Sequence, residues 1–128
     1  MIVGFIGLGN VGGKLSGSLL RNEIDLTVYD LNQDLVNDFV SRGALKADRP
    51  ASMMRDCDVV ITCLPSPAAS AAVMDEMLPE VRAGKIWMEM STTDEAEVKR
   101  LGALVMERGG AAVGGGGLGG RPARKKKK

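Results

Sequence analysis

The sequence contains no histidine, only two cysteines and 3% aromatic residues. Without histidine or a C-x-x-C pair, the chain has few of the side chains from which a metal site is built, so we expect none. Cys57 and Cys63 share one apolar, strand-like run, and a separation of six positions along a strand spans roughly 20 Å. A disulfide needs Cα atoms within about 7 Å. We therefore expect two free thiols and a reducing, cytoplasmic location.

Long apolar runs are also lacking, and none approaches the ~18 residues of a membrane span. A strand-like run begins at Ile2, so we expect no signal or transit peptide and no membrane partner. The net charge is +1, but six basic residues lie in the last eight positions. The remainder has 11 basic and 16 acidic residues, a net charge of −5. A mildly acidic body argues against nucleic-acid binding.

Strand-like and helix-like segments alternate along the chain. The expected strands cover residues 2–6, 26–29, 44–47, 59–64, 85–90 and 111–113. The expected helices cover residues 11–21, 33–42, 50–55, 67–79 and 94–108. The run 59–64 is apolar without alternation, which is typical of a strand covered on both faces. The alternation predicts an α/β protein with a doubly wound parallel sheet and helices on both faces.

The composition changes near the C-terminal end. Residues 109–120 contain eight glycines, and residues 121–128 are mostly basic. Neither stretch can bury enough apolar surface to fold alone. We therefore predict one domain over residues 1–113 and a disordered tail over residues 114–128. The basic segment has three interpretations, of which we favour the last two: a targeting or nucleic-acid patch, a solvated end, or an end that is not natural.

A glycine-rich turn lies between the first predicted strand and helix. It has the pattern G-x-G-x-x-G and consists of Gly7, Leu8, Gly9, Asn10, Val11 and Gly12. In a dinucleotide-binding turn the first glycine permits the tight bend, the second leaves room for a pyrophosphate and the third allows close packing of helix on strand. The following helix N-terminus offers free N–H groups to phosphates. Its strand–turn–helix setting makes this a Rossmann-type dinucleotide site, although a turn used only for packing is the alternative.

Asp30 ends the second predicted strand, 18 residues after Gly12. A carboxylate about 20 residues after the glycines binds the adenosine ribose hydroxyls in such sites. It would repel the 2′-phosphate of NADP, and no arginine follows within Leu31 to Gln33. We therefore expect NAD as the cofactor, with NADP not excluded. The alternative is that Asp30 is only a turn residue.

Three segments resemble one family at family-like spacing. They are Val3–Gly12, Asp58–Ser66 and Glu89–Thr92. Together they resemble the N-terminal domain of the β-hydroxyacid dehydrogenases, which include the 3-hydroxyisobutyrate and 6-phosphogluconate dehydrogenases. The resemblance implies a hydride-transferring oxidoreductase that acts on a small β-hydroxyacid or semialdehyde.

The resemblance also implies further cofactor contacts. It places the backbone of Leu64 and Pro65 against the cofactor and Thr92 at its nicotinamide end. Each position has a structural alternative. Pro65 can simply end a strand, and Thr92 with Glu95 forms an S/T-x-x-E capping box for the next helix.

Two departures from the family pattern bear on catalysis. The position of the family's substrate-holding serine is Gly114 here, and no lysine of this chain matches the family's catalytic lysine, which lies in a second domain. We therefore assign no catalytic residue and expect the isolated chain to be inactive. The alternative function is a non-catalytic dinucleotide-binding module whose basic tail binds an acidic partner. The sequence does not indicate an oligomeric state.

Overall fold

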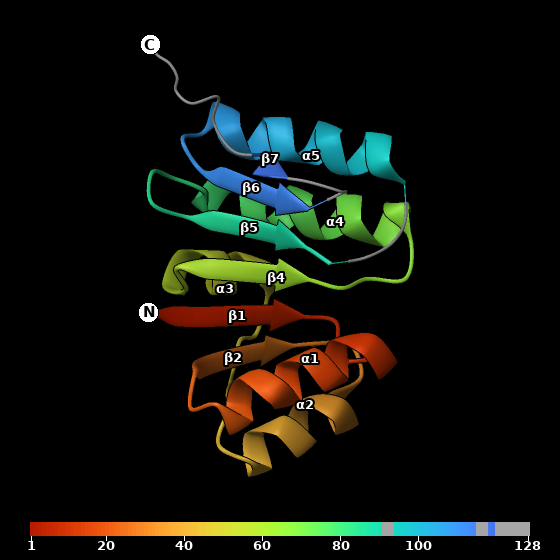
Figure 1. Cartoon of the computed structure of the whole chain (residues 1–128), viewed down its shortest axis with the longest axis vertical. Helices are drawn as coiled ribbons and strands as arrows, with labels where there is room; N and C mark the ends of the chain where they lie inside the picture. Colours follow the sequence, from red (N-terminus) through yellow and green to blue (C-terminus); the bar gives the residue numbers. More distant parts are fainter. Residues whose placement is uncertain (91–93, 115–117, 120–128) are drawn as a thin grey trace.

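Parallel strands form the centre of the molecule. The computed structural model describes residues 1–90, 94–114 and 118–119, and Figure 1 shows their arrangement. The strands are β1 (Ile2–Ile6), β2 (Asp25–Tyr29), β3 (Leu45–Lys46), β4 (Val59–Thr62), β5 (Ile86–Glu89), β6 (Ala111–Gly114) and β7 (Leu118–Gly119). The helices are α1 (Asn10–Arg21), α2 (Gln33–Ser41), α3 (Pro50–Asp56), α4 (Pro67–Met77) and α5 (Glu95–Glu107), with a 3₁₀ turn, η1 (Leu78–Glu80).

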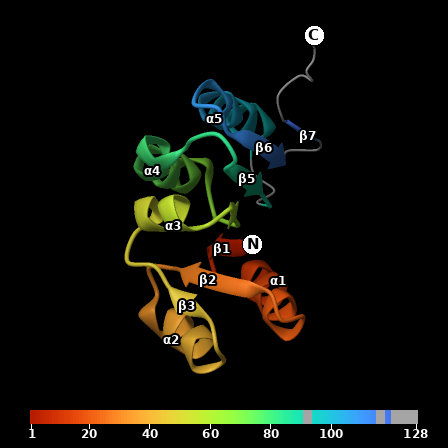
Figure 2. The ribbon, with the colours of Figure 1, turned by 90° about the vertical axis from the view of Figure 1, so that its left-hand side faces the viewer.

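The sheet has the strand order β3-β2-β1-β4-β5-β6-β7. Neighbouring strands from β3 to β6 run parallel, and β7 is antiparallel to β6. Helix α1 lies on one side of the sheet, and α3 and α4 lie on the other (Figure 2). This confirms the predicted doubly wound Rossmann-type fold. The strand order reverses at β1, so a crevice is expected where the carboxyl ends of β1 and β4 meet.

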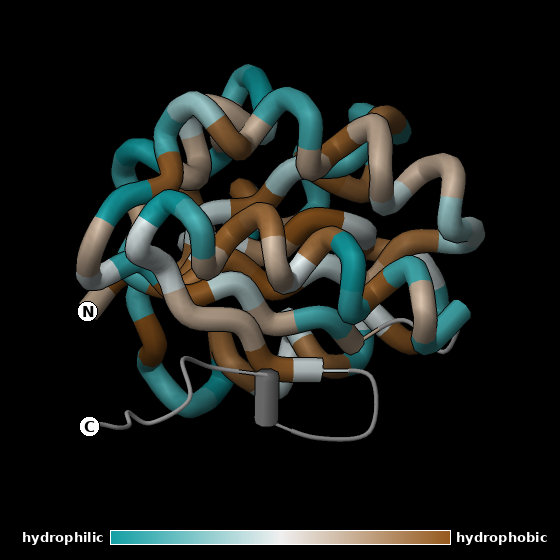
Figure 3. Tube along the Cα trace, turned by 90° about the horizontal axis from the view of Figure 1, so that it is seen from above, coloured by the Kyte–Doolittle hydropathy of each residue, from teal (hydrophilic) through white to brown (hydrophobic). Residues whose placement is uncertain are grey.

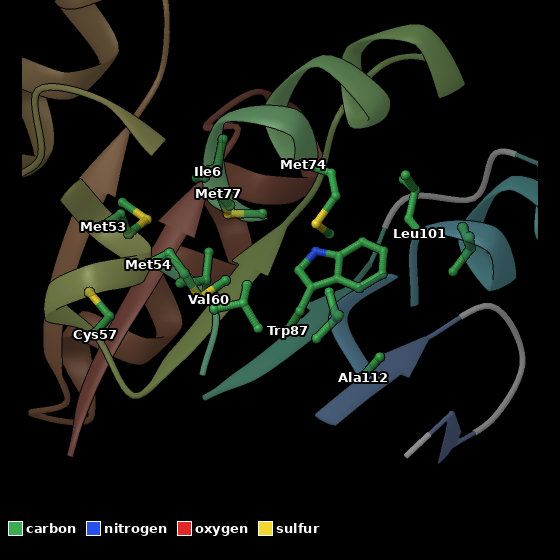
Figure 4. Packing of buried hydrophobic residues seen from close by; sticks show 13 residues of the cluster. Ile6, Met53, Met54, Cys57, Val60, Met74, Met77, Trp87, Leu101 and Ala112 are labelled. Atoms are coloured by element: carbon green, nitrogen blue, oxygen red, sulfur yellow. The ribbon is translucent and has the colours of Figure 1, made fainter. Parts of the chain in front are cut away.

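Apolar side chains fill both faces of the sheet. In Figure 3 the most apolar residues run through the middle of the molecule, where the strands lie. The larger cluster lies between the sheet and helices α3, α4 and α5. Trp87 of β5 is its largest side chain, with Met74 beside it (Figure 4). The indole Nε1 of Trp87 donates to Thr62 Oγ1 at 3.0 Å, which satisfies the buried polar end of the ring.

The structure moves several predicted boundaries by one or two residues. Strand β4 ends at Thr62 and not at residue 64. Both of its partners end at the same level, because Thr62 pairs with Ile6 of β1 and with Glu89 of β5. Beyond that point Cys63 N–H donates to Ile6 O at 2.9 Å, and Met90 N–H donates to Thr62 O at 2.8 Å. Residues 63–65 follow β4 at the carboxyl edge of the sheet.

The predicted tail meets the sheet at two places. Gly114 is the last residue of β6, and β7 pairs with β6 through the partners Leu118–Val113 and Gly119–Ala112. No pattern in the residues predicts β7. The other tail residues, 115–117 and 120–128, lie outside the described residues. The division into a domain over 1–113 and a tail over 114–128 remains a proposal.

No helix within the described part of the chain is both long enough and apolar enough to cross a bilayer.

Candidate functional site

A cavity of about 800 Å³ opens at the carboxyl edge of the sheet. It lies where the strand order reverses, which is the usual ligand position in this fold. Its walls come from the ends of β1, β2 and β4, the start of α1 and one face of α4. The lining residues near the strand ends are Ile6, Gly7, Gly9, Asn10, Val11, Gly12, Tyr29, Asp30, Leu31, Asn32, Cys63, Leu64, Pro65 and Met90. Helices α2, α3 and α4 add Leu35, Pro50, Ala69, Ala72, Val73 and Glu76.

Two of the three motif glycines are required by the protein's own backbone. Gly7 has φ +102°, and its N–H donates to Tyr29 O at 3.1 Å. A Cβ added there would overlap the carbonyl oxygen of Cys63, and one added at Gly12 would overlap the carbonyl oxygen of Gly7. These glycines therefore permit β1, β4 and α1 to approach closely, as the motif predicts.

Gly9 differs, because no atom lies within 4 Å of a Cβ added to it. It lines the cavity, and its φ of −70° is open to any residue. The protein itself therefore gives no reason for a glycine at this position. Space for a ligand gives one, since a pyrophosphate must approach the backbone there. Gly9 is also the N-cap of α1, and residues 9–12 line the cavity, so the free N–H groups and positive dipole end of this helix lie at the cavity. The first turn of α1 has no acidic residue that would offset this positive end.

Asp30 connects the glycine turn to the end of β2. Its Oδ2 accepts from Leu8 N–H at 2.7 Å, and its Oδ1 accepts from Asn32 N–H at 2.8 Å. Each carboxylate oxygen has a second lone pair, so ribose hydroxyls can still donate to it. The turn role and the cofactor role predicted for Asp30 are therefore compatible.

The remaining variable motif positions reach the cavity differently. Asn10 and Val11 line it, and Val11 is 60% exposed. Leu8 does not line it, because its side chain is packed in the core at 2% exposure and its N–H is held by Asp30. Leu8 contributes to the site by fixing the turn.

Leu64 and Pro65 line the cavity where β4 passes into α4. Ser66 Oγ accepts from Ala69 N–H at 3.1 Å and caps α4, whose first residue is Pro67. This cap directs the small residues of α4 towards the cavity. The end of this strand was predicted from the sequence, but the wall that α4 supplies was not. The one indication of that wall in the sequence is a run of small residues spaced along one helical face.

Thr92 lies outside the described residues, so its predicted cofactor contact remains a proposal. Its predicted role as the cap of α5 is wrong, because Asp94 is the N-cap. Asp94 Oδ1 accepts from Ala96 N–H at 2.9 Å and from Glu97 N–H at 3.3 Å. The spacing from Asp94 to Glu97 also fits a capping box, and a carboxylate is a strong N-cap.

The sequence profile of the NAD binding domain of 6-phosphogluconate dehydrogenase matches residues 2–128. The chain belongs to the β-hydroxyacid dehydrogenase family. It is 34% identical over 124 residues to the mitochondrial 3-hydroxyisobutyrate dehydrogenase of Rattus norvegicus, covering 89% of this chain and 36% of that protein. It therefore spans about a third of that relative's length and corresponds to the NAD-binding domain.

Two further similarities come from different kinds of protein. The cytokine-like nuclear factor N-PAC of Homo sapiens is 30% identical over 111 residues, which cover 84% of this chain and 20% of that protein. The solved 3-hydroxyisobutyrate dehydrogenase of Mycobacterium tuberculosis has a TM-score of 0.77 at 24% identity, over 91% of this chain and 41% of that one. The structural similarity supports the fold assignment.

The β-hydroxyacid dehydrogenase resemblance puts a substrate-holding serine at Gly114, and the local backbone explains the glycine. Gly114 has φ +145°, and a Cβ there would lie 2.7 Å from Glu89 O. Glu89 is 3% exposed and is the direct partner of Gly114 across β5 and β6. A serine at this position would therefore require the sheet edge to shift.

Both cysteines are free, as predicted. Burial raises the pKa of the Cys57 thiol, and burial followed by the charge of Glu89 raises the pKa of the Cys63 thiol. Cys63 lines the cavity as a neutral thiol, which is a poor nucleophile. Within residues 1–90, 94–114 and 118–119, no three histidine, cysteine or acidic side chains are grouped so that they could hold a metal ion.

Proposed function

We propose that this chain binds NAD as the dinucleotide-binding part of an oxidoreductase for a small β-hydroxyacid or semialdehyde. The single observation that carries this proposal is the convergence of Gly9, Asp30 and Pro65 on one cavity at the switch point of the sheet. The start of α1 would hold the pyrophosphate, Asp30 the adenosine ribose and the Leu64–Pro65 edge the middle of the cofactor. When bound, the nicotinamide supplies the hydride acceptor or donor.

We propose NAD in preference to NADP because of the charges in the cavity. The described lining contains the carboxylates Asp30 and Glu76 and no lysine or arginine. Asp30 lies where the 2′-phosphate of NADP would have to sit, and two like charges there repel each other.

The test is calorimetric titration of the purified chain with NAD and with NADP, in the wild type and in Asp30→Asn. We expect the wild type to bind NAD at least about tenfold more tightly, a difference of roughly 1.4 kcal/mol. Asp30→Asn keeps a side-chain oxygen for Leu8 N–H but removes the charge, so the preference should shrink. Equal affinities in the wild type would contradict the NAD assignment.

We further propose that the 128-residue chain binds the cofactor without turning over substrate. Oxidising an alcohol needs a base for the hydroxyl proton, and the family resemblance assigns that task to a lysine of a second domain. We also propose that the protein works in a reducing compartment, the cytoplasm, because both of its cysteines are free thiols.

The second candidate is a dinucleotide-binding module without a reaction of its own. The similarity to N-PAC, whose name describes a nuclear factor, favours this candidate. An acidic partner of the basic residues 121–128 belongs to the same proposal. Substrate turnover by a longer chain that contains this domain would favour the oxidoreductase over the non-catalytic module.

A further inference from the structure

One face of α4 forms a wall of the cavity that ends in a carboxylate. Ala69, Ala72, Val73 and Glu76 line the cavity, and their spacing places them on one side of the helix. The first three are small and apolar. Glu76 follows about 10 Å along the helix axis from Ala69. The wall is therefore a shallow apolar surface with a negative charge at its far end.

Other apolar side chains line the cavity outside α4. They are Leu31 in the loop after β2, Leu35 of α2 and Pro50 of α3. Leu31 is 86% exposed, so much of this side chain has no protein partner in the described structure. Apolar lining from several segments suits a flat aromatic base, which gains from apolar contact with its faces.

The order of the parts along the cavity decides which part of a dinucleotide lies there. The glycine turn would hold the pyrophosphate, and Asp30 at the end of β2 would hold the adenosine ribose. The base is attached to that ribose on the side away from the pyrophosphate. It would therefore enter the space between Leu31 and α4, and its edge would approach Glu76.

Glu76 has no hydrogen bond or ion pair with any other described residue. Its neighbour Asp75 faces a different direction. Glu97 is the main cause of the raised pKa of Arg100 on α5, and the charge of Asp75 adds to it. Asp75 does not line the cavity. The two adjacent carboxylates thus separate into one that faces α5 and one that faces the cavity.

We propose that Glu76 reads the base of the cofactor by accepting a hydrogen bond from the exocyclic amine of adenine. This inference rests on the proposed function. An amine N–H donates to a carboxylate, whereas hypoxanthine and guanine carry a carbonyl oxygen at the same ring position. A carboxylate repels that oxygen and leaves it without a donor. The cavity would therefore select an adenine dinucleotide by its base as well as by its ribose.

The experiment compares NAD with nicotinamide hypoxanthine dinucleotide, which carries a carbonyl oxygen in place of the amine. Both are titrated by calorimetry into the wild type, Glu76→Gln and Asp75→Asn. We expect the wild type to prefer NAD by about tenfold, as one charge-assisted hydrogen bond near the surface provides. Glu76→Gln should bring the two affinities within about threefold, because an amide can accept from the amine or donate to the carbonyl.

Asp75→Asn is the matched control, since it removes the same charge one residue away and should keep the wild-type ratio. Equal binding of both dinucleotides by the wild type would overturn the base contact and leave the proposed function intact. A Glu76→Gln variant that keeps the wild-type ratio, even with improved NADP binding, would also overturn it. A wild type that binds neither dinucleotide would refute the proposed function, and the base contact with it.

Discussion

The proposed adenosine end and the proposed nicotinamide end of the site are built to different degrees by this chain. At the adenosine end, Gly9 leaves an open space, Asp30 holds the turn and α4 supplies a wall. At the other end, β5 and β6 bring together Glu89 and Gly114, and the latter has no side chain for a substrate. Under the proposed function, cofactor binding needs only this domain, whereas the chemistry needs groups from a second domain.

The largest expected effect concerns the rate of substrate turnover, which tests whether the proposed nicotinamide end is incomplete. We expect the purified chain to oxidise 3-hydroxyisobutyrate, D-glycerate, 4-hydroxybutyrate or 6-phosphogluconate at least about 10⁴-fold more slowly than an ordinary dehydrogenase. The proposed function assigns the base for the hydroxyl proton, and further contacts to the substrate, to a second domain. Absorbance of the reduced nicotinamide measures the rate. An ordinary rate, from protein whose measured mass corresponds to the 128-residue chain, would show that the nicotinamide end is complete.

The next effect compares two glycines of the turn. Gly9→Val should weaken NAD binding at least about 100-fold, roughly 3 kcal/mol, while changing the free energy of unfolding by less than about 1 kcal/mol. Gly12→Ala should instead destabilise the fold by about 1–3 kcal/mol, because its Cβ would overlap the Gly7 carbonyl. Urea unfolding and calorimetric titration separate the two. Equal loss of stability in both variants would mean that Gly9 is not reserved for a ligand.

A third change asks whether Gly114 is a missing serine or a required glycine. Gly114→Ser should lower the free energy of unfolding by about 1–3 kcal/mol and produce no turnover. Gly43→Ser is the control, since Gly43 has φ +111° but no atom within 4 Å of its added Cβ. A larger loss at Gly114 than at Gly43 measures the overlap with Glu89. Equal losses of unfolding free energy in the two variants would mean that the positive φ alone, and not the overlap with Glu89, destabilises Gly114→Ser.

The smallest effect concerns the basic end. Deleting residues 120–128 should change the melting temperature by less than about 2 °C, because that segment is mostly basic and contains no large apolar side chain. A scanning calorimetry trace of each form measures it. A fall of many degrees would mean that these residues pack on the domain.

The sequence predicted the parts of the fold that depend on local patterns. The apolar runs at β1, β2 and β4, the glycine turn and Asp30 all have strong local signals, and all meet in the cavity. The wall of α4 had only a weak signal, its run of small residues, because the packing of the helix decides which of its faces lies over the strand ends.

Two other errors have similar causes. Thr92 and Asp94 both precede acidic residues at capping-box spacing, and sequence spacing alone cannot rank them. Strand β7 has only two residues and is fixed by its partners on β6, not by its own glycine-rich sequence. Predictions were thus reliable where one segment determines its own structure and failed where a neighbour determines it.

The most direct test of the central claim is an amide NMR titration of the ¹⁵N-labelled chain with NAD. The account predicts the largest shifts at the N–H groups of residues 9–12, 31–32 and 69–76, with small shifts along β3. Saturation at NAD concentrations that leave Gly9→Val unchanged would confirm the cavity as the site. Shifts confined to other surfaces, or none at millimolar NAD, would contradict it.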